Sequence, residues 1–502
     1  MKKTTMKSLY LKNSKLVDLE KNKIIPASIL IKNGRFVEVF SEKIHTQDLL
    51  CRYKNFPTLD LNGNFIIPGF VDAHTHLLSL GVERQRIDLS GCDSLSVCLE
   101  KLRENQENDL IFGVNWDESN WRKGTIAELN RDLLDKISDT KPVIMRRICG
   151  HFAVVNSKAL AAIPSNYKIV EPSKGYLYEN AALYLNQIFP PTPDMYERAI
   201  EIATEEALSR GITTVHEITD ATGFRIYQRY KKRLKLRICL YLTNFLEEAL
   251  QTGQPLDLQD VFLKFAGIKI FMDGSIGART AALKKPYQGT KNKGKLLIAE
   301  RELTKIFKKA GLKNLQLMIH SIGDRSTDVV LSVFKKLKLT ENPLRHRLEH
   351  IELLHNYQIE EIAKFKLIAS MQPNFLRWQG SSGMYEKNLG KRYKKMNCFK
   401  KLVQSGVRVI FGSDCMPIGP LNGINYAVNF PLRDVKLTPA QAFRFYTTEP
   451  HFATFDEDRL GLVKPGMQAD LVVLNKNPLQ KENLKDLKIL SVFINGVTVY
   501  KK

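Results

Sequence analysis

The sequence lacks the cysteine patterns that build a zinc knuckle or a disulfide framework. Its seven cysteines are scattered over 502 residues, their number is odd, and no two form a Cys-x-x-Cys pair. A disulfide-stapled scaffold is therefore disfavoured, and a reducing, cytoplasmic setting is expected. No glycine-rich phosphate loop follows an early strand pattern, which argues against an open, doubly wound nucleotide-binding sheet.

Long hydrophobic runs are also missing. No stretch approaches the roughly 18 apolar residues of a membrane span, so no membrane association is expected. Lys12, Lys15 and Asp18 interrupt the segment after the basic start, which is not the pattern of a secretory signal. The hydrophobic fraction of 43% and the charged fraction of 26% are typical of a globular chain with a large core.

Acidic residues are scarce relative to basic ones. The chain has 76 Lys and Arg against 53 Asp and Glu, a formal charge of +23. Such an excess can attract nucleic acid. However, the lysines at 291–295 are no denser than those at 391–395, and no basic stripe carries interleaved aromatic residues. We expect a solvated basic surface and a small-molecule substrate rather than nucleic acid; a homodimer is left open.

Both ends of the chain carry strand patterns. Residues 1–66 contain short apolar alternations around the tight-turn pair Asn33-Gly34, and residues 456–502 repeat this pattern around Asn495-Gly496. We predict that the two segments, 1–66 and 456–502, assemble into one small β-sandwich domain.

The middle of the chain, residues 67–455, alternates between strand-length and helix-length patterns. Helices are predicted near 195–210, 299–312, 324–337 and 356–365. Apolar runs of strand length occur eight times, at 65–71, 213–218, 236–242, 268–272, 316–319, 344–348, 367–371 and 407–411. This alternation predicts an α/β fold of the (β/α)8 TIM-barrel type.

One interval interrupts the barrel pattern. Residues 78–184 follow the first barrel strand and contain a candidate strand at 142–148 and a candidate helix at 126–137. We predict an insertion subdomain. An insertion after a barrel strand belongs to the carboxyl-terminal, catalytic face, where it can influence substrate choice.

Potential metal ligands stand at the predicted strand ends. His74 and His76 are two residues apart, so on a strand they point the same way and can share a divalent metal. Lys269 lies inside an apolar run, where a lysine is costly unless it is paired or neutralised. Carboxylation by CO2 would convert it to a carboxylate.

Three later strands add further candidates, His320, His350 and Asp414. His346 competes with His350, because the two are four residues apart as in a helical zinc pair. The glutamate that such a pair requires is absent, since Arg347 takes its place. The strand-end position therefore favours His350. Together these residues converge on the face of a barrel where catalysis occurs.

These motifs make the chain resemble the amidohydrolase superfamily, in particular its amidohydrolase 3 branch of YtcJ-like and N-substituted formamide deformylase-like hydrolases. The resemblance runs nearly end to end. Its most specific strings are the paired His-x-His of PGFVDAHTHL at 68–77 and DGSIGARTA at 273–281, supported by RHRLEHIE at 345–352 and GVRVIFGSD at 406–414.

The resemblance implies a site with one or two divalent metals, zinc preferred, although manganese or iron would also suit the ligands. It implies hydrolysis of a non-peptide C–N bond, in an amide or formamide, by metal-activated water, with Asp414 as proton shuttle. His74, His76 and Asp414 would bind the more buried ion. The implied ligand set is His74, His76, Lys269 as an N-carboxylysine bridge, His320, His350 and Asp414.

The chain departs from the branch at two positions beside the implied pocket. Glu217 stands where an aspartate is common, and Asn374 replaces a frequent threonine or serine. These departures put the substrate in doubt. Two alternatives stay open: a ring deaminase, which would place a glutamate where Gly323 stands, and a non-catalytic scaffold, which would have lost metal ligands.

Three further residues are candidates for substrate binding, each with a structural alternative. His151 either approaches the substrate or fixes its own loop. Arg279 either binds a substrate anion or pairs with Asp273. Trp116 either caps the pocket or is buried in the core of the insertion.

Overall fold

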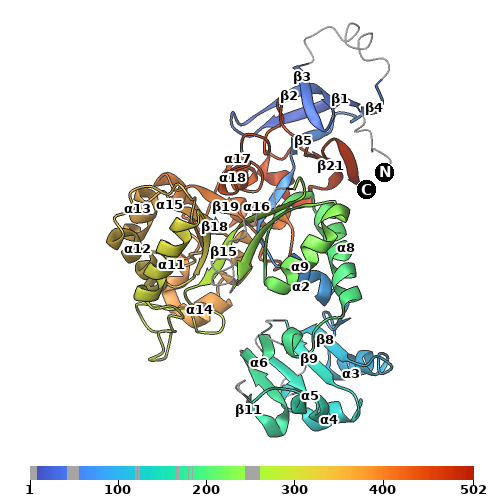
Figure 1. Cartoon of the computed structure of the whole chain (residues 1–502), viewed down its shortest axis with the longest axis vertical. Helices are drawn as coiled ribbons and strands as arrows, with labels where there is room; N and C mark the ends of the chain where they lie inside the picture. Colours follow the sequence, from blue (N-terminus) through green and yellow to red (C-terminus); the bar gives the residue numbers. More distant parts are fainter. Residues whose placement is uncertain are drawn as a thin grey trace. The chain divides into compact units, whose positions relative to one another are not determined.

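The computed structural model describes residues 8–41, 56–118, 121, 125–148, 150, 152–165, 169–178, 180–183, 185–243 and 260–502 (Figure 1). The chain divides into two compact units. The first comprises Met1–Leu77 and Thr204–Lys502, and the second comprises Leu78–Ala203. Among the described helices, none has both the length and the hydrophobicity that crossing a membrane requires.

The first unit contains the predicted barrel. Eight parallel strands pair in chain order from first to last. They are β6 (Phe70–Thr75), β13 (Ile212–Thr219), β14 (Arg237–Thr243), β15 (Leu263–Phe271), β16 (Gln316–Ser321), β17 (Arg347–His350), β18 (Ile368–Met371) and β19 (Val409–Phe411). Most of their residues are buried on both faces, which is why the sequence shows continuous apolar runs.

The last strand approaches the first through hydrogen bonds beyond its end. The Asp414 amide donates to the His74 carbonyl at 2.8 Å, and the Ser413 amide donates to Asp72 Oδ1 at 2.7 Å. Gly412 permits this approach, because a Cβ atom there would lie 2.4 Å from the His74 nitrogen. The eighth strand thus comes close enough to bring its end beside the first.

Helices follow the strands as the periodicity predicts. Their apolar positions recur every three to four residues; in α12 these include Thr327, Val330, Leu331 and Phe334. The helices of this unit include α9 (Ala221–Tyr230), α11 (Glu300–Leu312), α12 (Asp324–Lys336), α13 (Asn356–Lys364), α14 (Met384–Leu389), α15 (Phe399–Gln404), α16 (Pro420–Asn429), α17 (Pro439–Phe445) and α18 (Glu449–Ala453).

The apolar run at 65–71 is two strands rather than one. Residues Phe65–Pro68 form β5 of a separate sheet, and the barrel strand β6 starts only at Phe70. Gly69 makes the junction: its amide donates to the Asp470 carbonyl, and a Cβ atom there would lie 2.2 Å from Thr213 Oγ1. Both halves are equally apolar, so the break leaves no hydrophobic signal.

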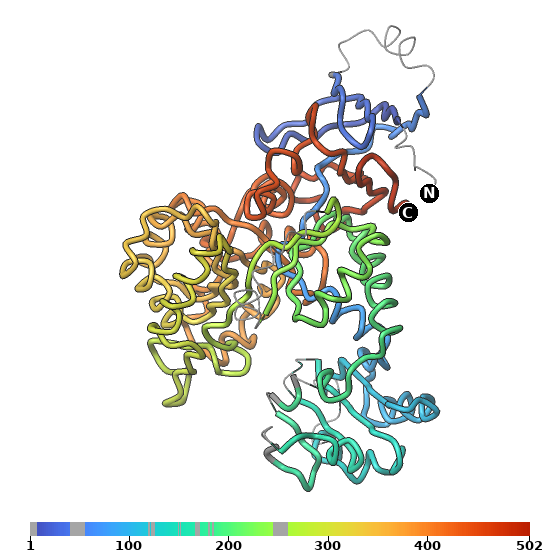
Figure 2. Tube along the Cα trace, viewed as in Figure 1, coloured from blue at the N-terminus to red at the C-terminus, as the bar shows by residue number. Residues whose placement is uncertain are grey.

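Strands from both ends of the chain share that separate sheet (Figure 2). Its order is β22-β21-β20-β5-β1-β2-β3, with β4 paired to β1, and β5 runs antiparallel to β20. The remaining members are β1 (Leu9–Asp18), β2 (Lys23–Lys32), β3 (Arg35–Ser41), β4 (Thr58–Asp60), β20 (Leu471–Leu474), β21 (Ile489–Ile494) and β22 (Val497–Lys501). Asn33-Gly34 and Asn495-Gly496 both have positive φ angles, as tight hairpin turns require.

The second unit is built on a six-stranded mixed sheet. Its order is β11-β12-β10-β9-β8-β7; β7, β8 and β9 are parallel and the others antiparallel. The strands are β7 (Ile87–Asp88), β8 (Ile111–Trp116), β9 (Val143–Arg147), β10 (Phe152–Val155), β11 (Ile169–Glu171) and β12 (Tyr176–Tyr178). The predicted helix at 126–137 is shorter, with α4 spanning only Arg131–Asp135.

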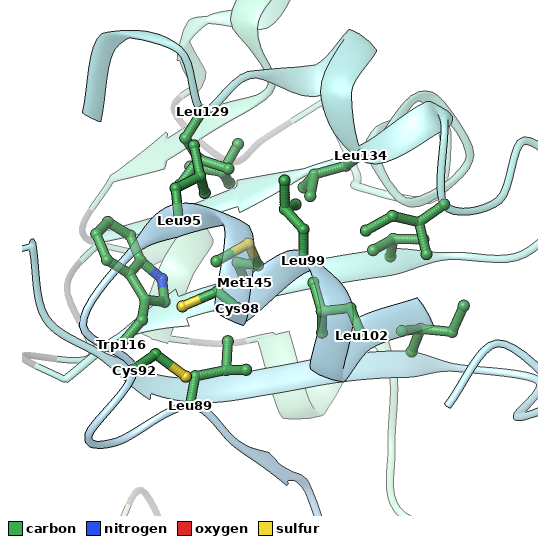
Figure 3. Close-up of a cluster of buried hydrophobic side chains, with 14 of the residues drawn as sticks. Leu89, Cys92, Leu95, Cys98, Leu99, Leu102, Trp116, Leu129, Leu134 and Met145 are labelled. Atoms are coloured by element: carbon green, nitrogen blue, oxygen red, sulfur yellow. The ribbon is translucent and has the colours of Figure 1, made fainter. Parts of the chain in front are cut away.

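A dense apolar core supports one face of this sheet (Figure 3). Helix α3 (Leu95–Arg103) begins after the N-cap residue Ser94 and places Leu95, Leu99 and Leu102 into this core. They pack with Met145 of β9. The insertion therefore has a hydrophobic core of its own.

Candidate metal centre

The six predicted metal ligands lie together at the carboxyl ends of the barrel strands. Lys269 Nζ is 3.4 Å from His74 Nε2, deep in the barrel. Asp414 Oδ1 lies 3.6 Å from His74 Nε2 and 3.2 Å from His76 Nε2. Strands β6, β15 and β19 thus deliver four side chains to one point, although they are far apart in the sequence.

His350 and His320 complete the cluster from the next two strands. The ring centroids of His74 and His350 are 4.7 Å apart, and those of His350 and His320 are 4.6 Å apart. His74, His350 and Asp414 each offer a ligand atom within 4.8 Å of the other two. Imidazole nitrogens and a carboxylate oxygen in such proximity suit zinc, manganese or iron.

The backbone is strained where two of these ligands leave their strands. His350 and Ile351 have φ angles of 71° and 34°, and Asp414 and Cys415 both have 55°. Left-handed conformations at residues other than glycine cost of order 1–3 kcal/mol each and persist where the surroundings enforce them. Here the turns direct the His350 and Asp414 side chains toward the cluster.

A buried carboxylate fixes the orientation of His74. His74 Nδ1 is 2.5 Å from Glu349 Oε2, and Arg347 Nε donates to Glu349 Oε1 at 2.6 Å. Burial raises the pKa of Glu349, but the charges of Arg347 and Lys269 outweigh it and leave the pKa below its usual value. Because an ionised carboxylate only accepts, His74 carries its proton on Nδ1 and presents the Nε2 lone pair to the cluster.

Two further histidines of the cluster are oriented by neutral acceptors. His350 Nδ1 lies 2.7 Å from Gln372 Oε1, and His320 Nε2 lies 3.1 Å from the Gly274 carbonyl. Burial lowers the pKa of His320 to about 4, so the ring is neutral near pH 7. A neutral imidazole with one nitrogen bonded to an acceptor keeps the other nitrogen available to a metal.

Lys269 is the lysine that lies inside an apolar run, where a charged side chain is costly unless it is paired or neutralised. Its side chain is buried, and burial lowers its pKa to about 8. A measurable fraction of its amine is therefore neutral near physiological pH, and the neutral amine is the nucleophilic form.

Sequence reasoning missed the residues that hold the ligands in place. Arg347, Glu349 and Gln372 are fully or almost fully buried behind the cluster. Asp273 fixes the loop after β15, accepting hydrogen bonds from the amides of Ala282, Ile322 and Gly323. The signal that singled out Lys269, a charge inside an apolar strand, also marks Arg347 and Glu349.

Glu217 and Asn374, the two positions at which the sequence departs from the amidohydrolase 3 branch, are both buried in the first unit. Glu217 is buried and accepts hydrogen bonds from Thr75 Oγ1 at 2.9 Å and the Leu77 amide at 2.6 Å, so it holds the segment after β6. Asn374 Nδ2 donates to the Pro417 carbonyl at 2.7 Å.

The competing His346 precedes β17 and packs against the helices outside the barrel. It is buried beside the rings of Phe307 on α11 and Phe334 on α12, and its Nδ1 accepts a hydrogen bond from the Leu317 amide at 2.9 Å. His346 and His350 thus lie in different places, and only His350 joins the cluster.

The candidates for substrate binding lie in different surroundings. Arg279 is exposed, and its Nε donates to Asn388 Oδ1 at 2.8 Å. Trp116 is fully buried in the core of the second unit (Figure 3). It stacks on Trp121 with ring centroids 5.3 Å apart. This is the core position that the sequence left as the alternative. His151 lies outside the described residues.

Known proteins are similar to this one over nearly the whole chain. The amidohydrolase YtcJ of Bacillus subtilis is 29% identical over 484 residues, covering 88% of this chain and 90% of its own. The N-substituted formamide deformylase of Arthrobacter pascens is 23% identical over 545 residues and 99% of each chain. An uncharacterized metal-dependent hydrolase from Pyrococcus furiosus superposes with a TM-score of 0.80 at 27% identity, covering 94% of this chain and 100% of that one.

The family model described as "Amidohydrolase family" matches residues 58–500, which include every residue of the cluster. Since that match covers most of the chain, the chain belongs to the amidohydrolase family of metal-dependent hydrolases.

Proposed function

We propose that this protein hydrolyses non-peptide C–N bonds, in amides or formamide-like compounds, and that Asp414 carries the proton. The observation that carries the proposal is the position of the Asp414 carboxylate, which lies against both His74 and His76 within the ligand cluster. Names of relatives agree with this chemistry: one is an amidohydrolase and another an N-substituted formamide deformylase.

The cluster fits one or two divalent ions, with zinc preferred. His74, His76 and Asp414 would hold one ion, His320 and His350 the other, and a carboxylated Lys269 would supply oxygen ligands to both. A divalent metal there supplies Lewis acidity and makes bound water more acidic.

Asp414 is suited to move a proton because it stays ionised. Burial raises its pKa, but the neighbouring His74, His76 and Lys269 outweigh burial and leave the pKa below its usual value. During hydrolysis a C–O bond forms from water and the C–N bond breaks. The Asp414 carboxylate takes the proton that water loses and delivers it to the leaving nitrogen.

Two alternatives fit less well. A deaminase would need a glutamate at position 323, but a Cβ atom on Gly323 would lie 2.0 Å from the Ala282 carbonyl oxygen, so the loop has no room for a side chain. A non-catalytic scaffold would not require the six candidate ligands to lie together.

Metal analysis, a substrate panel and a variant of Asp414 test the proposal. Metal analysis of purified protein should find one to two divalent ions per chain, and a panel of N-formyl and N-acyl compounds should yield released amine. Asp414→Asn should abolish turnover while most of the metal is retained. Metal-free protein from zinc-replete cells, or a fully active Asp414→Asn variant, would refute the proposal.

A further inference from the structure

An aromatic side chain at the mouth of the barrel plays no part in the chemistry proposed above. Phe271 ends β15, and 38% of its surface is exposed. It follows Lys269 by two residues, so both side chains leave the strand on the same side. Lys269 Nζ lies 5.2 Å from the Phe271 ring centroid, and the ring centroids of Phe271 and His320 are 5.4 Å apart. The phenyl ring therefore borders the ligand cluster and has an open face.

A second exposed apolar residue lies beside the same strand end. Leu297 is 58% exposed, and its amide donates to the carbonyl of Met272, the neighbour of Phe271, at 2.8 Å. Single exposed apolar residues are ordinary on any surface. Here two of them lie at the end of one strand, and the ring of Phe271 is beside the predicted metal ligands Lys269 and His320.

The opposite side of the mouth is polar. In the strand order β15 is fourth and β19 is eighth, so in a nearly closed barrel of eight strands they face each other. The β19 side, with its neighbour β6, carries Asp414 and His76. The proton carrier Asp414 and the exposed ring of Phe271 thus lie on opposite sides of the mouth.

This asymmetry orients the substrate, on the premise that Asp414 delivers the proton as proposed above. The leaving nitrogen then lies on the β19 side, and the acyl group extends toward β15. We infer that the preferred substrates are amides with an apolar acyl group of several carbons, which packs on Phe271 with Leu297 at its edge. Phe271 is then a specificity-determining residue, and formamides, which have no acyl chain, are cleaved more slowly than these amides.

The expected preference follows from the apolar area that the acyl chain buries. Each buried methylene contributes about fourfold to binding. A hexanoyl group that is partly covered by one phenyl ring and one leucine should gain roughly tenfold to hundredfold in kcat/KM over an acetyl group.

Acyl 4-nitroanilides test the inference, because the series shares one leaving group. The kcat/KM should rise from acetyl through butanoyl to hexanoyl 4-nitroanilide in the metal-loaded protein. Phe271→Ala should remove most of the rise, whereas Phe271→Leu should keep most of it. Metal content is measured for each variant.

Matched leucine variants serve as controls. Leu297→Ala should flatten the series in part. Leu312→Ala should leave it unchanged, because Leu312 is 84% exposed at the end of α11, before the start of β16 and therefore at the other end of the barrel. An equal effect of both variants would contradict the role of Leu297.

Product binding separates this inference from the proposed reaction. In calorimetry, hexanoate should bind the metal-loaded protein at least tenfold more tightly than acetate, and Phe271→Ala should abolish the difference. If no amide is cleaved but this difference holds, the proposed function fails and the apolar acyl site stands. Equal binding of the two acids, or a rate that follows the chain length on the amine side instead, overturns the inference.

Discussion

Replacing Glu349 with glutamine probes the support of the metal cluster without changing any ligand. Glu349 is fully buried and accepts hydrogen bonds from His74 Nδ1 and from Arg347 Nε and Nη2. Arg347 is fully buried as well; its Nη2 also donates to the Ala73 carbonyl and Ser370 Oγ, and its Nη1 lies 2.7 Å from His216 Nδ1. Glu349→Gln keeps the shape of the side chain but removes the charge that balances Arg347 and orients His74.

Glu349→Gln should change two quantities, the free energy of unfolding and the affinity for the metal. Removing one partner of a buried ion pair leaves an uncompensated charge and costs about 3–5 kcal/mol of unfolding free energy. Loss of a carboxylate behind a metal-binding histidine lowers metal affinity about 10- to 100-fold. Both effects should appear together, because the same carboxylate serves Arg347 and His74.

Urea unfolding and competition with a chelator measure the two effects separately. Glu341→Gln is the matched control: Glu341 pairs with Lys366 at 2.7 Å, but both side chains are 63% exposed, and such pairs contribute at most about 1 kcal/mol. If Glu349→Gln unfolds at the same urea concentration as Glu341→Gln and binds metal as tightly as the unmodified protein, the assigned role of Glu349 is refuted.

Three further predictions concern other parts of the molecule. Gly412→Ala should lower the metal bound per chain, because its Cβ would press on the His74 backbone; elemental analysis measures this. Burial lowers the pKa of His346 from 6.5 to about 4, so the unfolded chain binds more protons between these values and stability falls as the pH drops through this window. Thermal melts across the window should show a smaller fall, by up to about 3 kcal/mol, in His346→Gln. Trp116→Phe should retain kcat/KM, since Trp116 Nε1 has no hydrogen-bond partner among the described residues and the side chain is a core residue.

The barrel, and the clustering of residues at its strand ends, could be predicted from the sequence for a physical reason. Barrel strands are buried on both faces, so each appears as an apolar run, and parallel strands bring their carboxyl ends to one side. Polar residues near the carboxyl ends of these runs are therefore expected at the same end of the barrel. Lys269 and Asp414 could be placed at that end without knowing which strands pair.

The supporting network depends on strand order, which periodicity does not reveal. Arg347 reaches Ala73 on β6 and Ser370 on β18, and no spacing in the sequence indicates those contacts. Most strands of the predicted insertion could not be recognised in the sequence, for another reason. Strands β10, β11 and β12 have only three or four residues each, too few for an alternation to be distinguished from a loop.

The sheet shared by both chain ends has a consequence for synthesis. Arg35, which begins β3, donates to the carbonyl of Gly466, 431 residues later. At about 5–20 residues per second, a ribosome needs roughly 20–90 s to cover that distance. During this interval β5 has no β20 beside it, and an unpaired strand edge can pair with another chain. The nascent N-terminal strands are therefore exposed to aggregation until the last segment emerges, and the sheet is completed only after the barrel sequence has been made.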